Sequence, residues 1–323
     1  MKQTKMILLI VAGALVLLGT LMFVGTMAAN HWQFSNLGSA PCEIRTVEIS
    51  DSFHSISIDS ETEDITLVPS TDGSCKVVFN EPEKHTHTAA VTDGTLTIKE
   101  HDDQNWFDSF LYFSTESATI TVYLPQSEYK SLSIRESTGD ISIPENFTFE
   151  TMDVKASTGD VLCRASVGGA MYMETSTGGI RLEDLTAGEL RLTASTGRIV
   201  LRAVTCAGAA QLSVSTGKTE LADVSCDSLT STGSTGSLTL ERVNIVKKLT
   251  VERSTGDVRF VQSDAGELEI QTDTGDVTGT LCSTKVFLVQ SDTGSISVPE
   301  TTSGGKCKIT TDTGDIELDT ELP

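Results

Sequence analysis

The stretch Ser137-Thr138-Gly139-Asp140-Ile141-Ser142-Ile143 decides the fold, because close copies of it recur to the end of the chain. Each copy contains Ser-Thr-Gly or Asp-Thr-Gly, and consecutive copies are nineteen or twenty residues apart. The ten motif glycines are Gly139, Gly159, Gly178, Gly197, Gly217, Gly236, Gly256, Gly275, Gly294 and Gly314. A period this regular indicates a solenoid, in which each repeat is one coil that buries its apolar face against the neighbouring coils.

Each repeat contains two short runs that alternate between apolar and polar residues. The first follows the glycine, as in Ile141-Ser142-Ile143, and a second follows about eight residues later, as in Leu190-Arg191-Leu192. Alternation with a period of two is typical of a strand with one buried face. We therefore predict an all-β, parallel β-solenoid (β-helix-like) with coils of 19–20 residues and two strands each.

The Ser-Thr-Gly motif is the predicted corner between the two strands of a coil. Its glycine supplies a backbone conformation with positive φ that other residues adopt only at a cost. Threonine precedes the glycine in all ten copies, and we expect the stacked hydroxyls to hydrogen-bond along the column. Repeat length varies on the other side of the coil, at segments such as Pro144-Glu145-Asn146 and Gly168-Gly169.

Residues 43–135 resemble the same repeat in a degenerate form. Ile56 and Ile58, the corner Thr62-Glu63-Asp64, and then Ile65 and Leu67 match one coil with Glu63 in place of glycine. We interpret this segment as an irregular N-terminal β cap, followed by the regular solenoid repeats at 136–323. Acidic residues of the last repeat, Asp315, Glu317, Asp319 and Glu321, are expected to protect the opposite edge from strand pairing.

The N-terminal segment predicts a membrane anchor. Residues 6–29 contain no charge and are long enough to span a bilayer. Lys2 and Lys5 precede this run and place a cytoplasmic tail at 1–5, so a linker at 30–42 and the bulk of the chain lie outside the cytoplasm. A signal peptide cleaved near Thr26-Met27-Ala28 is the alternative, but the apolar run exceeds a usual signal core. We expect a single-pass protein of the cell membrane with its N-terminus inside.

Charge narrows the range of partners. The chain has 23 Lys and Arg against 45 Asp and Glu, a formal net charge of −22. A nucleic-acid partner is therefore not expected. Such a surface attracts divalent cations or cationic polymers, although a solvated face of a solenoid explains the same charge.

Three late repeats carry Asp-Thr-Gly, the tripeptide of aspartic proteases. A protease dyad needs two such loops that face each other, whereas these are stacked, so we predict neither catalytic residues nor a cofactor. Asp273 with Asp276, and Asp312 with Asp315, are candidate calcium ligands because they place carboxylates on both sides of a turn. Aspartate is also an ordinary turn residue, and this structural interpretation is preferred.

The cysteines and histidines do not form a recognised site. The seven cysteines include no Cys-x-x-Cys pair. Cys206 and Cys226 occupy the same repeat position and are expected to stack, either as core residues or as a disulfide. All five histidines precede the repeats, and His85-x-His87 lacks the further ligands that a zinc site needs.

One cluster of aromatic residues interrupts the strand pattern in a chain that is only 5% aromatic. It consists of Trp106, Phe107, Phe110, Tyr112 and Phe113. Two interpretations are open. The cluster is either a hydrophobic plug over the open end of the solenoid or an exposed binding surface.

Three consecutive segments carry a resemblance to a known family. They are Thr119-Ile120-Thr121-Val122-Tyr123-Leu124-Pro125, then Tyr129-Lys130-Ser131-Leu132-Ser133-Ile134, then the Ser-Thr-Gly-Asp repeats from Ser137 onward. Over most of residues 43–320 the chain resembles the bacterial putative-adhesin family of extracytoplasmic β-solenoid domains of unknown function. The resemblance implies export and a non-enzymatic role in the cell envelope.

Three functions are compatible with these observations. The first is a membrane-anchored, extracytoplasmic binding or scaffold module that presents a repetitive face to a cell-envelope protein or glycan. The second is an accessory subunit of an envelope-stress signalling system that acts through a membrane partner. The third is a carbohydrate-active β-helix enzyme, which rests on architecture alone. We favour the first and expect no catalysis.

Overall fold

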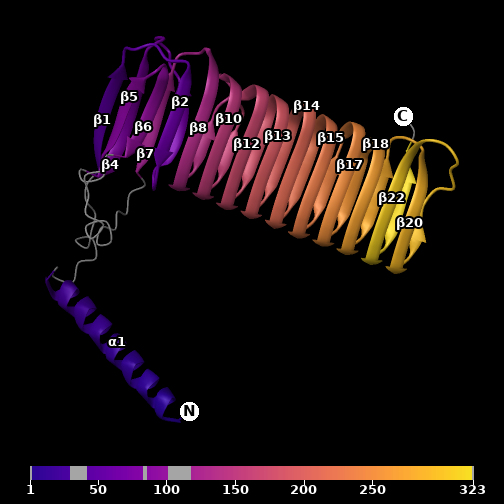
Figure 1. Cartoon of the computed structure of the whole chain (residues 1–323), viewed down its shortest axis with the longest axis horizontal. Coiled ribbons are helices and arrows are strands. Elements are labelled where there is room, and N and C mark those ends of the chain that lie inside the picture. Colours follow the sequence, from indigo (N-terminus) through magenta and orange to yellow (C-terminus); the bar gives the residue numbers. More distant parts are fainter. Residues whose placement is uncertain (1, 30–41, 83–85, 101–117, 322–323) are drawn as a thin grey trace.

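A computed structural model of the chain describes residues 2–29, 42–82, 86–100 and 118–321 (Figure 1). It contains the helix α1 (Lys2–Ala29), and every other element is a β-strand. Within these residues, no helix combines the length and the apolar character needed to cross a membrane. The membrane anchor at residues 6–29 stays a prediction.

The strands form a parallel β-solenoid. Those of the N-terminal part are β1 (Cys42–Ile49), β2 (Ser55–Ser60), β3 (Asp64–Pro69), β4 (Cys75–Pro82), β5 (His87–Thr92), β6 (Thr95–Glu100) and β7 (Thr119–Leu124). Those of the repeats are β8 (Glu128–Thr138), β9 (Ile141–Ile143), β10 (Thr148–Thr158), β11 (Val161–Cys163), β12 (Ser166–Thr177), β13 (Ile180–Thr196), β14 (Ile199–Thr216), β15 (Thr219–Thr235), β16 (Leu238–Glu241), β17 (Asn244–Thr255), β18 (Val258–Thr274), β19 (Val277–Leu281), β20 (Lys285–Thr293), β21 (Ile296–Ser297), β22 (Gly305–Thr313) and β23 (Ile316–Thr320).

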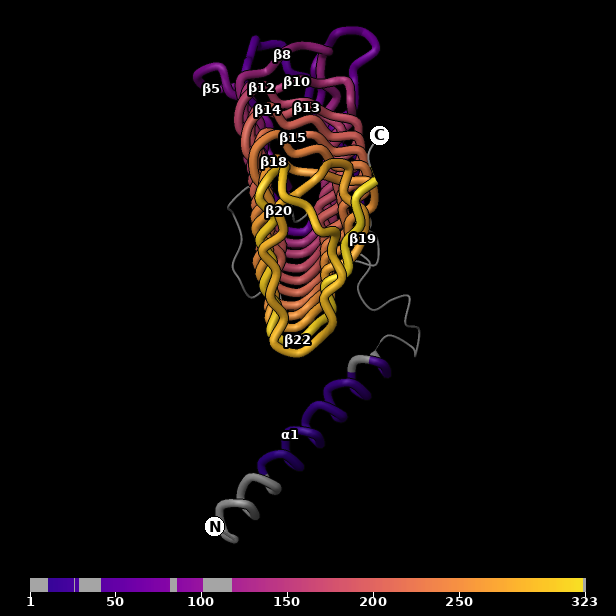
Figure 2. Tube along the Cα trace, turned by 90° about the vertical axis from the view of Figure 1, so that its right-hand side faces the viewer, coloured from indigo at the N-terminus to yellow at the C-terminus, as the bar shows by residue number. Residues whose placement is uncertain are grey.

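Corresponding residues of neighbouring coils pair in register, as Ile180 does with Ile199 and Ile199 with Thr219. The predicted all-β solenoid is therefore confirmed. Viewed along the stack, each coil is a long narrow loop that closes at the Ser-Thr-Gly corner, near the β22 label (Figure 2). Inward-facing side chains merge into one apolar core that extends from Ile56 to Leu318.

The coils differ from the predicted two strands by a third paired section. In β13, residues 180–183, 185–187 and 190–196 each pair with β14. The chain turns between the first two sections at Asp184, whose φ is 54°. The middle section adds two further side chains to the core, and the register shifts after it. From the coil of Gly178 to that of Gly256, repeat length varies at this shift, because an extra residue there disturbs neither inward-facing column. In the coil of Gly139 it also varies at the turn with Pro144, Glu145 and Asn146.

The N-terminal end is closed by antiparallel strands. The coil β2–β3 exists as predicted, with Glu63 at the position of a motif glycine, and it stacks between β8–β9 and the pair β6 and β7. Beyond this pair, β5 joins β6, β4 joins β7, and β1 joins β4, all antiparallel. Because these strands pair antiparallel, the N-terminal end of the stack has, within the described residues, no edge on which a further parallel coil could form.

The last two coils are stacked out of sequence order. β22 pairs with β18 on one side and with β20 on the other, and β23 likewise lies between β19 and β21. The repeat at Gly314 therefore lies between those at Gly275 and Gly294. The prediction that acidic residues of the last repeat protect the outer edge is wrong, since β23 lies inside the stack. The outer edge is formed by β20 and β21 (Figure 1).

Candidate functional site

The ten motif glycines lie at the predicted corner, where the coils approach one another most closely. Gly217 has a φ of 144°. A Cβ atom built on it would overlap the carbonyl oxygen of Gly197 in the preceding coil, and most of the other motif glycines stack in the same way. Only glycine fits a column that combines positive φ with this close approach. The corner is thus a structural element whose outer surface consists of exposed Ser, Thr and Asp side chains.

Backbone amides hold this corner together, not the threonine hydroxyls. The amide of Gly217 donates to the carbonyl oxygen of Thr235 at 2.8 Å, and that of Gly236 donates to Thr255 at 2.8 Å. The motif threonines are exposed, and their hydroxyls make no hydrogen bond within the described residues. The predicted hydroxyl column is therefore wrong, because each hydroxyl points to solvent beside the stack.

The aspartate that follows the glycine caps the next coil. Oδ1 of Asp276 accepts a hydrogen bond from the amide of Asp315 at 2.8 Å, and Oδ1 of Asp315 accepts one from the amide of Ser295 at 2.7 Å. Hydrogen bonding lowers the pKa of the Asp315 carboxyl. Two of the four calcium candidates are thus engaged with the protein itself.

The other two candidates, Asp273 and Asp312, lie on the outer face beside the corner. They are neighbours in the stack, because the coil of Asp312 is inserted before that of Asp292. Among the described residues, no group of three or more His, Cys, Asp and Glu side chains is arranged to hold a metal ion.

Cys206 and Cys226 stack as predicted, since they pair in register between β14 and β15. Both are buried free thiols. Burial raises the pKa of Cys226 to about 12, which keeps the thiol protonated and unreactive. They pack as small core residues in this structure. The aromatic cluster, with Trp106, Phe107, Phe110, Tyr112 and Phe113, and His85 lie outside the described residues.

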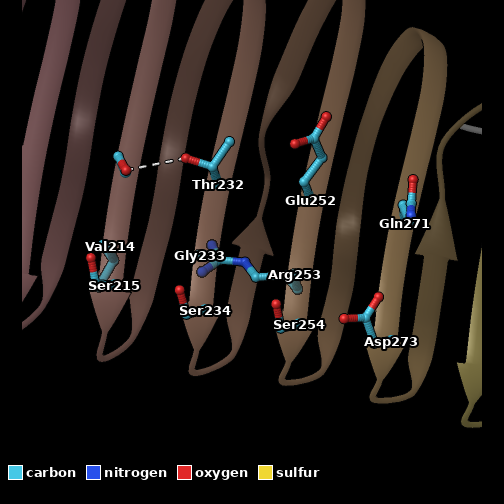
Figure 3. A pocket seen from close by; sticks show the side chains of 11 residues that line it. Val214, Ser215, Thr232, Gly233, Ser234, Glu252, Arg253, Ser254, Gln271 and Asp273 are labelled. Carbon is cyan, nitrogen blue, oxygen red and sulfur yellow. Dashed lines mark hydrogen bonds between the residues drawn. The ribbon is translucent and has the colours of Figure 1, made fainter.

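A shallow polar groove runs across four coils on the outer face of one sheet (Figure 3). It has a volume of about 440 Å³. Outward side chains of alternate residues line it, namely Ser213, Ser215, Thr232, Ser234, Glu252, Ser254, Gln271 and Asp273. The stacked coils repeat this row of hydroxyl, amide and carboxylate groups at about the 4.8 Å spacing of β-strands.

Arg253 is a buried cation behind this groove, on the core side of the sheet. Its guanidinium extends towards Gly233, whose missing side chain leaves the necessary space (Figure 3). Nη2 donates to the hydroxyl oxygens of Ser231 at 2.8 Å and Thr219 at 3.2 Å. Nε and Nη1 have no partner in the described part of the chain. The sequence alone did not single out this residue, because the pairing of the coils brings these groups together.

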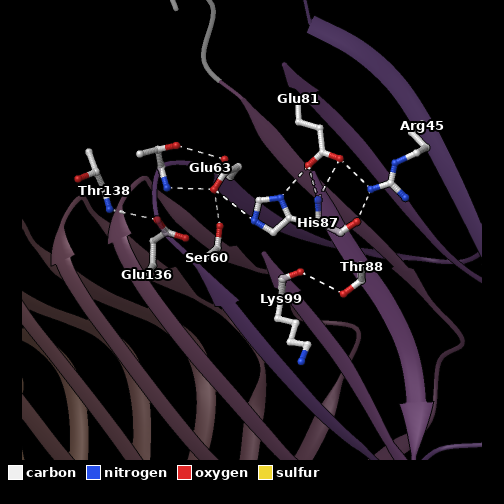
Figure 4. Close-up of polar contacts among 10 residues, drawn as sticks. Arg45, Ser60, Glu63, Glu81, His87, Thr88, Lys99, Glu136 and Thr138 are labelled. Carbon is white, nitrogen blue, oxygen red and sulfur yellow. Dashed lines mark hydrogen bonds and ion pairs between the residues drawn. The ribbon is translucent and has the colours of Figure 1, made fainter. Parts of the chain in front are cut away.

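A second cluster of buried charges lies at the N-terminal cap (Figure 4). His87, on β5, is 2% exposed, and its Nδ1 lies 2.7 Å from Oε2 of Glu81 on β4. Its Nε2 lies 3.6 Å from Oε2 of Glu63 at the corner of the β2–β3 coil. Arg45 completes the cluster with a hydrogen bond of 2.7 Å to Glu81.

Proton affinities in this cluster are shifted by burial and by the neighbouring charges. Burial alone would lower the pKa of His87, but the hydrogen bond to Glu81 and the charges of Glu63 and Glu81 outweigh it and raise the pKa. Burial opposes ionisation of Glu81, yet hydrogen bonds from His87 and Arg45 lower its pKa. The histidine–carboxylate pair is therefore held in its charged form.

Glu136 lies near the same cluster and behaves differently. It is 4% exposed and accepts a hydrogen bond of 3.1 Å from the amide of Thr138. Burial, together with the charge of Glu63, raises its pKa to about 7. His87, Glu81 and Glu63 hold charge inside the cap, whereas Glu136 also lines a surface hollow of about 310 Å³. Sequence reasoning missed this cluster because its members are far apart in the chain.

These features define the class of the protein as a parallel β-solenoid of stacked repeats with polar outer faces. Within this class, residues 53–213 and 207–321 match the model of the Toastrack DUF4097 family. The chain belongs to this family, which confirms the resemblance predicted from the sequence. No curated protein matches this chain significantly.

Several solved structures are similar to this chain at low sequence identity. A putative adhesin from Parabacteroides merdae is 13% identical, with a TM-score of 0.50, and the match covers 75% of this chain and 97% of that one. A putative lipid binding protein from Parabacteroides distasonis is 14% identical over 86% of this chain and 97% of that one, with a TM-score of 0.48. A putative adhesin from Bacteroides fragilis is 14% identical over the same shares, with a TM-score of 0.44. At 13% identity, the likeness to the Parabacteroides merdae protein indicates the fold alone.

Proposed function

We propose that the chain is a non-catalytic binding or scaffold module of the bacterial cell envelope, adhesin-like in its mode of action. The observation that carries this proposal is the polar groove over four coils, where identical backbone geometry presents a row of outward side chains. A rigid row of this kind matches a partner that is itself extended or repetitive, such as an envelope protein or a glycan.

The environment of the titratable groups supports a role without catalysis. A hydrolase needs an acid, a base or a nucleophile that faces a substrate in a cleft. His87, the buried histidine of the described chain, is already paired with Glu81 and Glu63. The outward carboxylates of the groove, Glu252 and Asp273, have no basic partner in the described residues.

Attachment to the membrane is part of the proposal. The uncharged run at residues 6–29 supports it, together with the lysines that precede this run. The full chain is expected in the membrane fraction of cells, and a chain that starts at residue 31 without an export signal is expected in the soluble fraction. Recovery of both forms in the same fraction would argue against an anchor.

The binding role is tested with residues 31–323, whose core from Ile56 to Leu318 is formed by the solenoid itself. Retention of this fragment on isolated cell-wall and membrane fractions is measured with and without calcium. We expect saturable retention, at least tenfold weaker after Thr232→Arg, because the long cation obstructs the groove. Thr239→Arg, on the outer face of the other sheet, is the matched control. No retention under any condition would contradict the proposal. In the same assay, Trp106→Ala and Phe110→Ala test whether the aromatic cluster contributes to retention.

A further inference from the structure

At the corner, each aspartate that follows a motif glycine accepts a hydrogen bond from a backbone amide of the adjacent coil. These aspartates form a column that is interrupted in the middle of the solenoid. Towards the N-terminal end, Oδ1 of Asp140 accepts the amide of Asp160 at 2.8 Å, and Oδ1 of Asp160 accepts the amide of Gly179 at 2.6 Å. Towards the C-terminal end, the column resumes where Oδ1 of Asp257 accepts the amide of Asp276 at 3.1 Å. Each carboxylate thus satisfies an exposed N–H group one coil away.

Four consecutive coils lack this carboxylate. The position after the glycine is occupied there by Gly179, Arg198, Lys218 and Ser237. The amides that would be capped belong to Arg198, Lys218, Ser237 and Asp257. None of these four N–H groups has a hydrogen-bond acceptor in the part of the chain that the structure describes. We call this row of open amides the corner gap.

Cations flank the corner gap in a protein that is otherwise strongly acidic. Arg198 and Lys218 are exposed and lie on adjacent coils, since the amide of Ile199 donates to the carbonyl oxygen of Lys218 at 3.0 Å. Like charges on adjacent strands repel each other. Neither side chain has an ion-pair partner within the described residues. The pair therefore favours an external anion.

A hollow of about 390 Å³ adjoins the corner gap at its N-terminal end. It forms where Gly179 contributes no side chain, and its charged lining residues are Asp140, Asp160, Arg181 and Arg198. Arg181 is only partly neutralised, by Glu183 at 3.4 Å. The carboxylates of Asp140 and Asp160 already accept the amides of Asp160 and Gly179, so the charged side chains that the four coils of the corner gap themselves place after the glycine are Arg198 and Lys218.

We propose that the corner gap binds a linear acidic glycan whose carboxylates take the places of the missing aspartates. The neighbouring coils show to which group these amides donate, because a carboxylate oxygen already accepts at the equivalent position there at 2.6–3.1 Å. Arg198 and Lys218 supply the charge that the ligand carboxylates require. This site lies at the corner, beside the groove of the proposed function, and the two adjoin at the motif serines Ser215 and Ser234.

Spacing favours a glycan over an acidic peptide. The open amides recur once per coil, at about 4.8 Å, and an acidic polysaccharide carries one carboxylate on every sugar unit together with hydroxyls. In an extended peptide, side chains on one face recur at about 6.6 Å, so successive carboxylates fall out of step with the coils. Exposed hydroxyls of the Ser-Thr motif lie along the same corner and can bond to sugar hydroxyls.

Titration of the full chain in detergent solution with polygalacturonate oligomers tests this proposal. We expect saturable binding that weakens with salt, no binding of dextran, and at least a tenfold loss in the variant Arg198→Ser/Lys218→Ser. The matched control is Lys248→Ser/Lys308→Ser, which removes the same charge from another face. Arg198→Asp/Lys218→Asp restores the internal caps, so it should remain folded and lose binding.

Three results would overturn the proposal. They are no binding of polygalacturonate by the native chain, an equal loss in the matched control, and binding of polyglutamate as tight as that of the glycan at the same residues. The last result would assign the corner gap to acidic peptides. Thr232→Arg, which obstructs the groove, should leave polygalacturonate binding unchanged, so failure of this site and failure of the groove are distinguishable.

Discussion

At the residue scale, the absence of a side chain at each motif glycine allows neighbouring coils to come into backbone contact. At Gly217, the carbonyl oxygen of Gly197 occupies the space that a Cβ atom would need, and φ is 144°. Both conditions recur along the column, so the coil spacing at the corner is set by backbone atoms in direct contact. A glycine of this kind is required by geometry and not by function.

Gly217→Ala is expected to lower the free energy of unfolding by about 2–4 kcal/mol, because it adds a strained φ and a collision with backbone. Gly168→Ala is the control, since a Cβ there would lie 4.0 Å from the nearest atom, the carbonyl oxygen of Phe149. Urea unfolding of both variants measures the difference. Equal stability of the two variants would show that the corner relaxes around the methyl group.

Arg253 is a buried charge with too few hydrogen-bond partners. It keeps its charge at any ordinary pH, and two of its nitrogens have no partner among the described residues. We expect Thr219→Val/Arg253→Met to raise the free energy of unfolding by about 1–3 kcal/mol, since apolar side chains of similar volume replace a buried ion. Thr219→Val alone, which leaves the guanidinium with one acceptor fewer, should destabilise. A double variant less stable than the native chain would contradict this account.

At the scale of elements, the cap joins β2, β4, β5 and β8 through charges that respond to pH. Glu136 and His87 both have raised pKa values in the folded chain. Folding therefore takes up protons. The stability that these groups contribute is fully present below their unfolded pKa values and is lost as pH rises through the folded ones.

The free energy of unfolding is expected to fall between about pH 4.5 and 7, where Glu136 ionises, and to fall further above pH 6.5, where His87 loses its proton. Glu136→Gln should flatten the first part of this dependence and leave the second. Urea titrations at a series of pH values measure both. A native chain whose stability is constant or rises over pH 5–8 would refute the assignment.

At the scale of the whole molecule, the order of the final coils is the least expected feature. Coil order in a solenoid normally follows the sequence, because each coil forms on the one before it. Here the coil β22–β23 lies between β18–β19 and β20–β21. The chain therefore forms the outer coil β20–β21 first and then returns to the position that it left open beside β18–β19. The first two residues of the acidic β23, Ile316 and Glu317, are thereby paired on both sides, and the edge is left to strands with fewer charges.

Paired cysteine substitutions test this order. Gln271 and Thr310 are in register on adjacent strands, and so are Thr310 and Gln290. Gln271→Cys/Thr310→Cys should form a disulfide, whereas Gln271→Cys/Gln290→Cys should not, because two strand spacings of about 4.8 Å exceed the reach of a disulfide. Non-reducing mass spectrometry detects the link. A disulfide only in the second pair would restore the sequential order.

Much of the coil was predictable from the sequence, and the candidate site much less so. The alternation of Ile141, Ser142 and Ile143 and the glycine at the corner are local signals, so the strands and the corner lie where they were predicted. The cap over β6 and β7, the pairing of His87 with Glu81 and Glu63, and the space beside Gly233 that Arg253 fills depend on contacts between distant residues. No local pattern marks such contacts in advance.

The sequence by itself determined the coil: its length, its buried face, its glycine corner and its membership of a repeat family. Tertiary structure alone decided which coils are neighbours at the two ends, which aspartates cap an amide and which amides stay open at Arg198 and Lys218. The physical reason is that the repeats are nearly equivalent as local segments. The differences between repeats affect the structure only through stacking, because stacking decides whether a side chain finds a hydrogen-bond or packing partner on the adjacent coil.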